Sequence, residues 1–430
     1  MKLQLDSIDI RDIEIGSRTM ASDHMLYLDL RELEELLLKD DRIKSVELNV
    51  VRPGDRVRIV NVVDVIQPRC KTDQRNEDFP GWLGKLAIAG RGRTRSLRGI
   101  TIVLSNRHSK RLYSGLIDMF GIGAEMSSYG GMRHLLIDPT PLEGTDERDF
   151  ESAVKIAGLK TAVFLARAAR EHPVDHTEFY ELDLPTLLAG EKSTLPRIAY
   201  YYQLHSPQHD YQGLPDPIFY GAPVPNLLPT LIHPNEVLDG GIVNSHTIRG
   251  MDTYTIQNHA VIKELFERHG KELIFTGVVI GAACLEPIQR QRMSIMAANL
   301  VSHVLGADGV ILTKVHGGMP HVDLGLVAEA CEDLGVKTTL FAQVWSSSGS
   351  LSDYVLFSSN SLDAIVSVGN NLERVQLPQA NTILGGTPET RMYNPDRSQT
   401  AGDEAIETEI FLLAGAFDYL GGSKIVADEY

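Results

Sequence analysis

The chain has 430 residues, a hydrophobic content of 43% and a formal net charge of −16 at pH 7. This length allows two or three domains, and the acidic balance argues against a nucleic-acid partner, which needs a concentrated basic surface. No apolar run approaches the roughly 18 to 20 residues that cross a bilayer, and the N-terminus carries no signal-peptide pattern, so we expect a cytoplasmic protein without membrane contact.

Short strands are expected to dominate the first hundred residues. Leucines at helical spacing predict a short helix over 30–38, and β-branched residues between turn signals predict a strand over 56–66. The next elements are a strand over 100–105, a long helix over 150–171 that ends before Pro173, and a buried strand over 197–203. A stretch rich in proline and glycine follows, from 207 to 234.

From about residue 261 the pattern becomes a regular alternation of helices and strands. The helices are predicted at 262–268, 287–304 and 324–334, and the strands at 273–280, 309–313, 337–342, 364–368 and 382–384. Such alternation indicates a doubly wound, mostly parallel sheet of the Rossmann-like type. We therefore expect an α/β protein with a strand-rich N-terminal region over 1–100, an α/β domain over 101–245 and a Rossmann-like α/β domain over 246–430.

The segment Asn244-Ser245-His246-Thr247 follows a glycine pair and places two hydroxyl groups beside an imidazole. A Ser or Thr oxygen that attacks the preceding carbonyl converts the peptide into an ester, and β-elimination then opens the chain. The product is an α-keto acyl group at the new N-terminus, pyruvoyl from Ser245 or 2-oxobutyryl from Thr247. The alternative is an intact loop whose hydroxyl groups satisfy backbone groups.

Several longer strings of residues resemble one known family. They are Val51-Arg52-Pro53-Gly54-Asp55, Val63-Asp64-Val65-Ile66-Gln67-Pro68-Arg69, Ile117-Asp118-Met119 with Gly121-Ile122-Gly123-Ala124-Glu125, the stretch 229–243, the stretch 263–273, and Leu305-Gly306-Ala307-Asp308-Gly309-Val310-Ile311. Across nearly the whole chain, the sequence resembles the glycine/sarcosine/betaine reductase component B proproteins.

The resemblance implies a precursor that is cut at an Asn-Cys bond, so that the cysteine becomes a pyruvoyl group on the downstream subunit. It also implies an amino substrate bound at the keto carbon, and a partner subunit whose thiol or selenol attacks the substrate. The implied outcome is reductive cleavage of a C–N bond within a complex of several subunits.

The chain departs from this family at the processing site itself. An ungapped match places His246-Thr247 at the family's Asn-Cys, and Met251 at a second cysteine. No cysteine lies between Cys70 and Cys284, so processing at a cysteine is excluded, and only Ser245 or Thr247 remains as the nucleophile.

Histidines gather near the expected strand ends. His205 and His209 follow the predicted strand over 197–203, His246 lies in the processing segment, and His316 and His321 enclose a glycine loop. Imidazole groups in this arrangement suit Zn²⁺, Fe²⁺ or Mn²⁺, and such a metal would polarise a carbonyl or activate water in an unprocessed hydrolase or lyase. Surface positions and hydrogen bonding are the alternative explanation of these histidines.

Two further charged residues are candidates. Glu125 lies in one of the family-like strings and is predicted either as an acid/base group or as half of a buried ion pair. Lys314, at the end of a predicted strand, is interpreted either as an anchor for a substrate carboxylate or as an exposed charge.

These observations predict a subunit of a reductase-like complex that cleaves a C–N bond of a small amino- or amide-containing molecule, with a thiol- or selenol-bearing partner subunit and an oligomeric assembly. The alternatives are the metal-dependent enzyme and a non-catalytic scaffold subunit.

Overall fold

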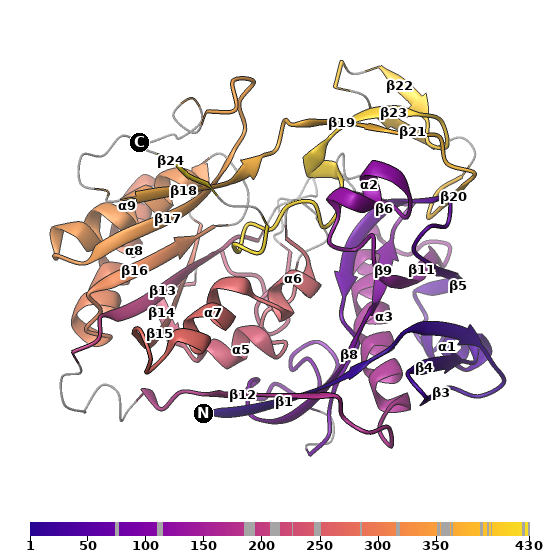
Figure 1. Cartoon of the computed structure of the whole chain (residues 1–430), viewed down its shortest axis with the longest axis horizontal. Coiled ribbons are helices and arrows are strands. Elements are labelled where there is room, and N and C mark those ends of the chain that lie inside the picture. Colours follow the sequence, from indigo (N-terminus) through magenta and orange to yellow (C-terminus); the bar gives the residue numbers. More distant parts are fainter. Residues whose placement is uncertain are drawn as a thin grey trace.

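The computed structural model describes residues 1–73, 77–109, 115–184, 194–206, 216–225, 227–244, 251–283, 286–314, 319–350, 353, 362, 364–387, 390–393, 395–396, 398–423 and 426–428. The six-stranded sheet and its helices form one side of the molecule and the seven-stranded sheet forms the other, while β1 (Lys2–Asp9) and β12 (His176–Glu181) of the four-stranded sheet run along the lower edge in the view of Figure 1. Within the described residues, no helix is both long and apolar enough to cross a membrane.

The N-terminal side contains a four-stranded and a six-stranded sheet. The first has the order β12 (His176–Glu181), β1 (Lys2–Asp9), β8 (Gly92–Arg98) and β7 (Arg69–Lys71). The second has the order β10 (Gly115–Asp118), β6 (Val57–Ile66), β9 (Ile100–Ser105), β11 (Arg133–Pro141) and β5 (Ile43–Val51), and β20 (Thr382–Leu384) pairs with β6. Smaller elements surround them: β2 (Asp12–Ile15), β3 (Met20–Ser22), β4 (Met25–Leu28), α1 (Leu30–Leu37) and α2 (Gly121–Met126).

The helix α3 (Glu147–Ala168) packs on this side and buries one face among the strands. It begins at Asp146, whose side chain accepts a hydrogen bond from the Arg148 backbone N–H, as a good N-cap residue does. Gly158 lets the helix approach β9 closely, because a Cβ at this position would lie 2.6 Å from Leu104. The resulting core joins α1, α3 and the central strands.

The C-terminal side is a seven-stranded sheet with helices on both faces. Its order is β14 (Thr230–Ile232), β15 (Ile274–Ala282), β13 (Arg197–Leu204), β16 (Gly309–Thr313), β17 (Lys337–Val344), β18 (Ala364–Asn370) and β24 (Val426–Asp428). One face packs against α8 (Pro287–Asn299) and α9 (Met319–Asp333), and the other against α5 (Pro234–Leu238), α6 (Thr253–Gln257) and α7 (Ala260–Arg268). The five inner strands run parallel, which confirms the predicted doubly wound α/β fold.

Most predicted elements lie within a few residues of the observed ones, with two informative differences. The predicted helix over 287–304 is α8 followed by a π-helix over Leu300–Val304. The strand Thr382–Leu384 has the predicted bounds, but it pairs with β6 on the N-terminal side and does not extend the C-terminal sheet, so that part of the prediction is wrong. The rest of the C-terminal segment lies beside α2 as β19 (Arg374–Leu377), β21 (Arg391–Tyr393), β22 (Gln399–Ala401), β23 (Ile406–Glu409) and a 3-10 turn over Ile410–Leu412 (Figure 1).

Candidate functional site

The order of the parallel strands locates a ligand-binding edge. Taken in chain order, β13, β15, β16, β17 and β18 are arranged 2-1-3-4-5, so that β15 and β16 lie on opposite sides of β13. Ligands of such open sheets bind outside the carboxyl ends of the strands where the connections diverge. In this chain that position, which we call the switch point, lies between the ends of β13 and β16.

Polar side chains occupy the switch point. Gln203 at the end of β13 and Lys314 directly after β16 are both buried, and His205 just beyond β13 is half-buried. Tyr202 pairs with Thr313 in the parallel ladder, so Gln203 and Lys314 occupy the next position on each strand. Burial lowers the pKa of Lys314 well below its ordinary value, and burial together with the nearby Lys314 charge lowers the pKa of His205 to about 4.

One buried network holds Asn244 and Met251, the residues on either side of 245–250. The Asn244 backbone N–H donates to Thr253 Oγ1 at 3.2 Å, and its side-chain Nδ2 donates to the Met251 carbonyl at 3.3 Å. Thr253 in turn donates to Asp64 through its backbone N–H (2.8 Å) and its hydroxyl (2.6 Å), and Asp64 forms an ion pair with Lys155 of α3. Asp64 and Lys155 are fully buried, so Asn244 and Thr253 are tied to the core of the N-terminal side.

A small cavity lies between His205 and the residues that flank 245–250. Its volume is about 10 Å³, too little for a substrate, and Asn244, Met251, Tyr202 and His205 all line it. The residues on either side of 245–250 are therefore neighbours of His205. Asn244, the first residue of the processing segment of the sequence analysis, therefore lies near the ligand-binding edge of the sheet.

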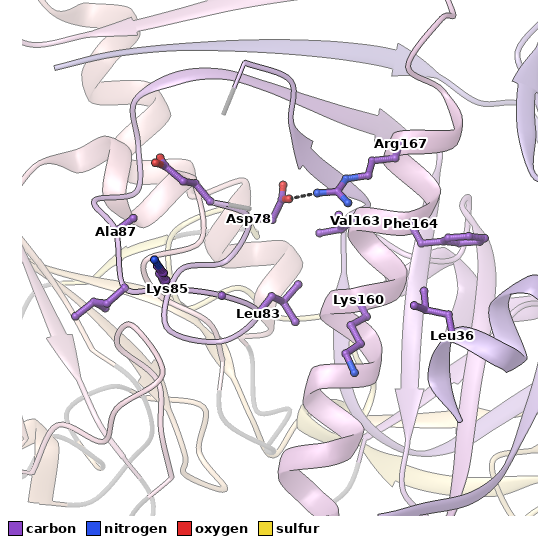
Figure 2. A pocket seen from close by; sticks show the side chains of 12 residues that line it. Leu36, Asp78, Leu83, Lys85, Ala87, Lys160, Val163, Phe164 and Arg167 are labelled. Atoms are coloured by element: carbon purple, nitrogen blue, oxygen red, sulfur yellow. Dashed lines mark hydrogen bonds and ion pairs between the residues drawn. The ribbon is translucent and has the colours of Figure 1, made fainter. Parts of the chain in front are cut away.

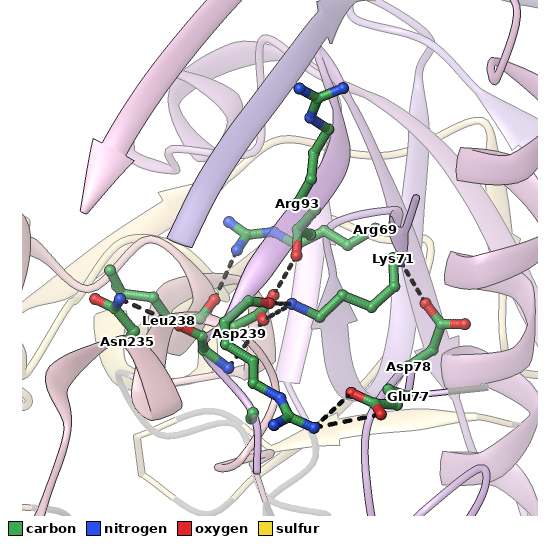
Figure 3. Close-up of polar contacts among 12 residues, drawn as sticks. Arg69, Lys71, Glu77, Asp78, Arg93, Asn235, Leu238 and Asp239 are labelled. Carbon is green, nitrogen blue, oxygen red and sulfur yellow. Dashed lines mark hydrogen bonds and ion pairs between the residues drawn. The ribbon is translucent and has the colours of Figure 1, made fainter. Parts of the chain in front are cut away.

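Three polar residues at the end of β6 and in β7 make further contacts of this kind: Gln67, directly after β6, and Arg69 and Lys71 of β7, which Figure 3 labels. The Gln67 backbone N–H donates to the Gln257 side chain at 2.9 Å, and the Arg69 guanidinium donates to the Gln257 carbonyl at 2.9 Å. The guanidinium also donates to the Leu238 carbonyl at 2.7 Å (Figure 3). Lys71 forms a buried ion pair with Asp239. With Asp64, these polar residues tie Leu238, Asp239, Thr253 and Gln257 to the N-terminal sheets.

A groove of about 870 Å³ lies elsewhere, between α1, α3 and the loop over 77–87 (Figure 2). Its walls include Leu36, Leu83 and Phe164, and at one end Arg167 pairs with Asp78 at 2.7 Å. Among the predicted site residues that the structure describes, Glu125, His205 and His321, none lines it, so its size alone does not make it the site of the chemistry.

Comparison with known proteins identifies the family. Residues 1–428 match the family described as glycine/sarcosine/betaine reductase component B subunits. This chain belongs to that family. It is 33% identical over 438 residues to the glycine reductase complex component B subunits alpha and beta of Acetoanaerobium sticklandii, with 100% of both chains covered.

Two further component B relatives come from Peptoclostridium acidaminophilum. The sarcosine reductase complex component B subunit alpha is 32% identical over 389 residues, which is 90% of this chain and 89% of the relative. The betaine reductase complex component B subunit alpha is 32% identical over 397 residues, which is 90% of this chain and 88% of the relative. No solved structure matches the chain.

The structure places some of the predicted site residues of this component B chain. His205 lies at the switch point, and His321 is fully buried in the first turns of α9. Glu125 is exposed on α2, so it is not half of a buried ion pair, and α2 packs against β10 and β19. The remaining predicted site residues lie outside the described residues: Ser245, His246, Thr247, His209 and His316.

The described residues contain no group of three or more His, Cys, Asp or Glu side chains that could hold a metal ion. Three of the five predicted histidine ligands lie outside that part of the chain. Asp323, close to His321 in sequence, forms a buried ion pair with Arg290.

Sequence reasoning missed Gln203, Asp64, Lys155 and Thr253. A signal existed for Asp64, because it lies in the family-like string over 63–69, although its role depends on contacts with Lys155 and Thr253 that are distant in sequence. Lys314 was considered, and its burial excludes the reading as an exposed charge.

Proposed function

We propose that this chain is a component B-type subunit of a reductase complex that cleaves a C–N bond of a small amino- or amide-containing molecule. Support comes from relatives over the whole chain that are named for glycine, sarcosine and betaine reductase complexes. In this proposal a thiol- or selenol-bearing partner subunit supplies the two electrons, and the substrate nitrogen leaves as ammonia or an amine.

One observation carries the assignment of the site. The residues that flank 245–250, Asn244 and Met251, belong to the Asp64–Lys155–Thr253 network and lie next to His205. Flanking residues that are held in place suit chemistry that requires a defined backbone geometry between them. A keto acyl group made from Ser245 or Thr247 would supply an electrophile there for a substrate amine.

Intact mass under denaturing conditions tests the self-processing part of the proposal. We expect two fragments that meet within 244–247, with the C-terminal fragment gaining mass on borohydride reduction. Ser245→Ala and Thr247→Ala identify the nucleophile, since only the correct one leaves the chain whole, and Ser128→Ala, at an exposed serine, is the matched control. A single full-length species contradicts self-processing and leaves membership of the complex standing.

Reconstitution tests the complex itself. The purified chain, mixed with the thiol- or selenol-bearing subunit of a related reductase, is expected to co-elute with it on size-exclusion chromatography. The mixture is expected to release ammonia or an amine from glycine, sarcosine or betaine. Co-elution without turnover would instead favour a non-catalytic scaffold subunit.

The second candidate is an unprocessed metal-dependent hydrolase or lyase. It is favoured by the position of His205 at the switch point and of His321 in the helix that follows β16. Elemental analysis of the purified protein decides this point: Zn, Fe or Mn at about one equivalent supports it, whereas a metal-free active sample contradicts it.

A further inference from the structure

The groove between α1, α3 and the loop over 77–87 has no role in the proposed function. Its volume is about 870 Å³. Its floor is formed by one face of α3, to which Lys160, Val163 and Phe164 belong (Figure 2). The buried face of the same helix packs against the strands of the N-terminal side. The helix therefore presents a partly apolar surface that its own sheet does not cover.

The tip of the loop exposes two large apolar side chains beside this groove. Leu86, which lines the groove, is 73% exposed, and Ile88 is 54% exposed. Among the described residues, no large hydrophobic side chain is more exposed than Leu86. Exposed apolar patches of this kind mark sites of protein–protein contact. The patch contains both a projection and a hollow, which is the combination that lets one surface bind a second copy of itself.

The loop that carries these side chains is fixed in place. At its start, Asp78 forms an ion pair with Arg167 of α3 at 2.7 Å. Just beyond its tip, the Gly90 backbone N–H donates to the Asp239 side chain at 3.0 Å. A loop that is already ordered loses less conformational entropy on binding than a mobile one. The apolar tip is therefore preorganised for contact with another surface.

Two walls of the groove carry opposite charges. Lys85 lies on the loop, and Glu32 lies on α1, one helical turn before Leu36 of the groove wall and on the same face of the helix. Both side chains are exposed, and neither forms an ion pair within the described part of the chain. Their charges are available for a pair between two copies, and a two-fold axis would form that pair twice.

We propose that this groove is the interface of a symmetric dimer, in which the loop tip of each copy, with Leu86 and Ile88, enters the groove of the other. Leu86 then packs on Phe164 across the interface, and Lys85 meets Glu32. The projection and the hollow lie on one patch, which favours a second copy over an unrelated partner subunit. This inference goes beyond the proposed function and does not depend on it.

Sedimentation equilibrium of the full chain at a series of concentrations tests the dimer. We expect the unmodified protein to have twice the mass of one chain. Leu86→Asp is expected to raise the dissociation constant by about 100-fold or more, because it buries a carboxylate in an apolar groove. Leu86 is exposed in the single copy, so an unchanged circular dichroism spectrum and Tm are expected to show that this variant folds.

An exchange of charges tests the arrangement of the two copies. Lys85→Glu and Glu32→Lys are each expected to weaken the dimer by about 10-fold, because each change places like charges opposite one another. The double variant Lys85→Glu/Glu32→Lys restores the opposite charges and should recover most of the affinity. A general loss of stability would not be reversed in this way, and a double variant that is weaker than both single ones contradicts the proposed arrangement.

Ile295→Asp is the matched control, because Ile295 is 59% exposed on α8, on the C-terminal side of the molecule (Figure 1). It should leave the dimer intact. The proposal is overturned if the unmodified chain is a monomer at every concentration, which would leave the groove to a partner subunit. It is also overturned if Leu86→Asp remains dimeric or if Ile295→Asp dissociates the dimer. None of these results involves turnover, so each of them leaves the proposed function standing.

Discussion

At the scale of single residues, the Asp64–Lys155 ion pair is the contact on which the processing segment depends. Asp64 accepts hydrogen bonds from Val65 and twice from Thr253, in addition to its contact with Lys155. Removing one partner leaves the other charge buried without compensation, which costs far more than the pair itself contributes. Loss of either charge is therefore expected to lower the stability of the protein and to displace Thr253 and Asn244.

We expect Lys155→Met to lower the free energy of unfolding by about 3 to 5 kcal/mol, measured by urea denaturation. The double variant Asp64→Asn/Lys155→Met should recover part of this loss, because no uncompensated charge remains. Lys160→Met, on the same helix at a half-exposed position, is expected to change stability by less than about 0.5 kcal/mol. Equal losses in Lys155→Met and Lys160→Met would contradict the role of the buried pair.

Asp252 supplies a prediction of pH dependence. It caps α6 and accepts a hydrogen bond from the Tyr129 hydroxyl, and burial raises its pKa from 3.8 to about 7. The folded protein holds the Asp252 proton more tightly than the unfolded chain does, because the pKa of Asp252 is higher in the folded state. The stability that this proton contributes is fully present below pH 3.8 and is lost as the pH rises towards 7. Relative to the unmodified chain, Asp252→Asn should thus gain about 2 kcal/mol between pH 5 and pH 7, measured by denaturant unfolding at each pH. A stability difference that stays constant across this range would contradict the raised pKa.

At the scale of elements, β6 and β7 act as the support for the chain on both sides of the processing segment. The family-like string over 63–69 contains Asp64, Gln67 and Arg69, which contact α6 and the end of α5. A string that looks like a buried strand thus has a second role, since its polar members bind a segment nearly 190 residues further along. This role explains why polar residues interrupt an otherwise apolar strand.

Arg69→Met is expected to loosen α5 and α6 without disturbing α8. The guanidinium bridges the Leu238 and Gln257 carbonyls, so its loss leaves two buried carbonyls unpaired. Hydrogen–deuterium exchange should become faster over 234–257 and stay unchanged over 287–299, which serves as the internal control. Uniform acceleration of both regions would show global destabilisation instead.

At the scale of the whole molecule, the two sides of the processing segment are interleaved. β13 precedes the segment in the chain but lies between β15 and β16, which follow it, and β20 pairs with β6 on the N-terminal side. Because β13 is hydrogen-bonded on both of its edges, it can leave the sheet only if the hydrophobic core around the sheet is disrupted.

A chain broken between 244 and 251 should therefore remain one particle. Replacing 245–250 with a protease-cleavable sequence and cutting it is expected to give two fragments that co-elute under native conditions and separate in concentrated guanidinium chloride. Insertion of the same sequence at the exposed Gly54 turn is the control for the insertion itself. Separation of the fragments in native buffer would contradict the interleaved arrangement.

The sequence by itself determined the α/β class, most of the helix and strand ranges and the family, because hydrophobic periodicity and long matching strings are local properties of the chain. Tertiary structure alone decided which sheet receives Thr382–Leu384, how β13 is placed between later strands, and that Lys314 is buried beside Gln203. These features depend on pairing between residues far apart in sequence, and no local pattern encodes the partner. The switch point depends on the strand order of the folded sheet, because it lies where the connections from neighbouring strands run in opposite directions. No sequence motif marks it.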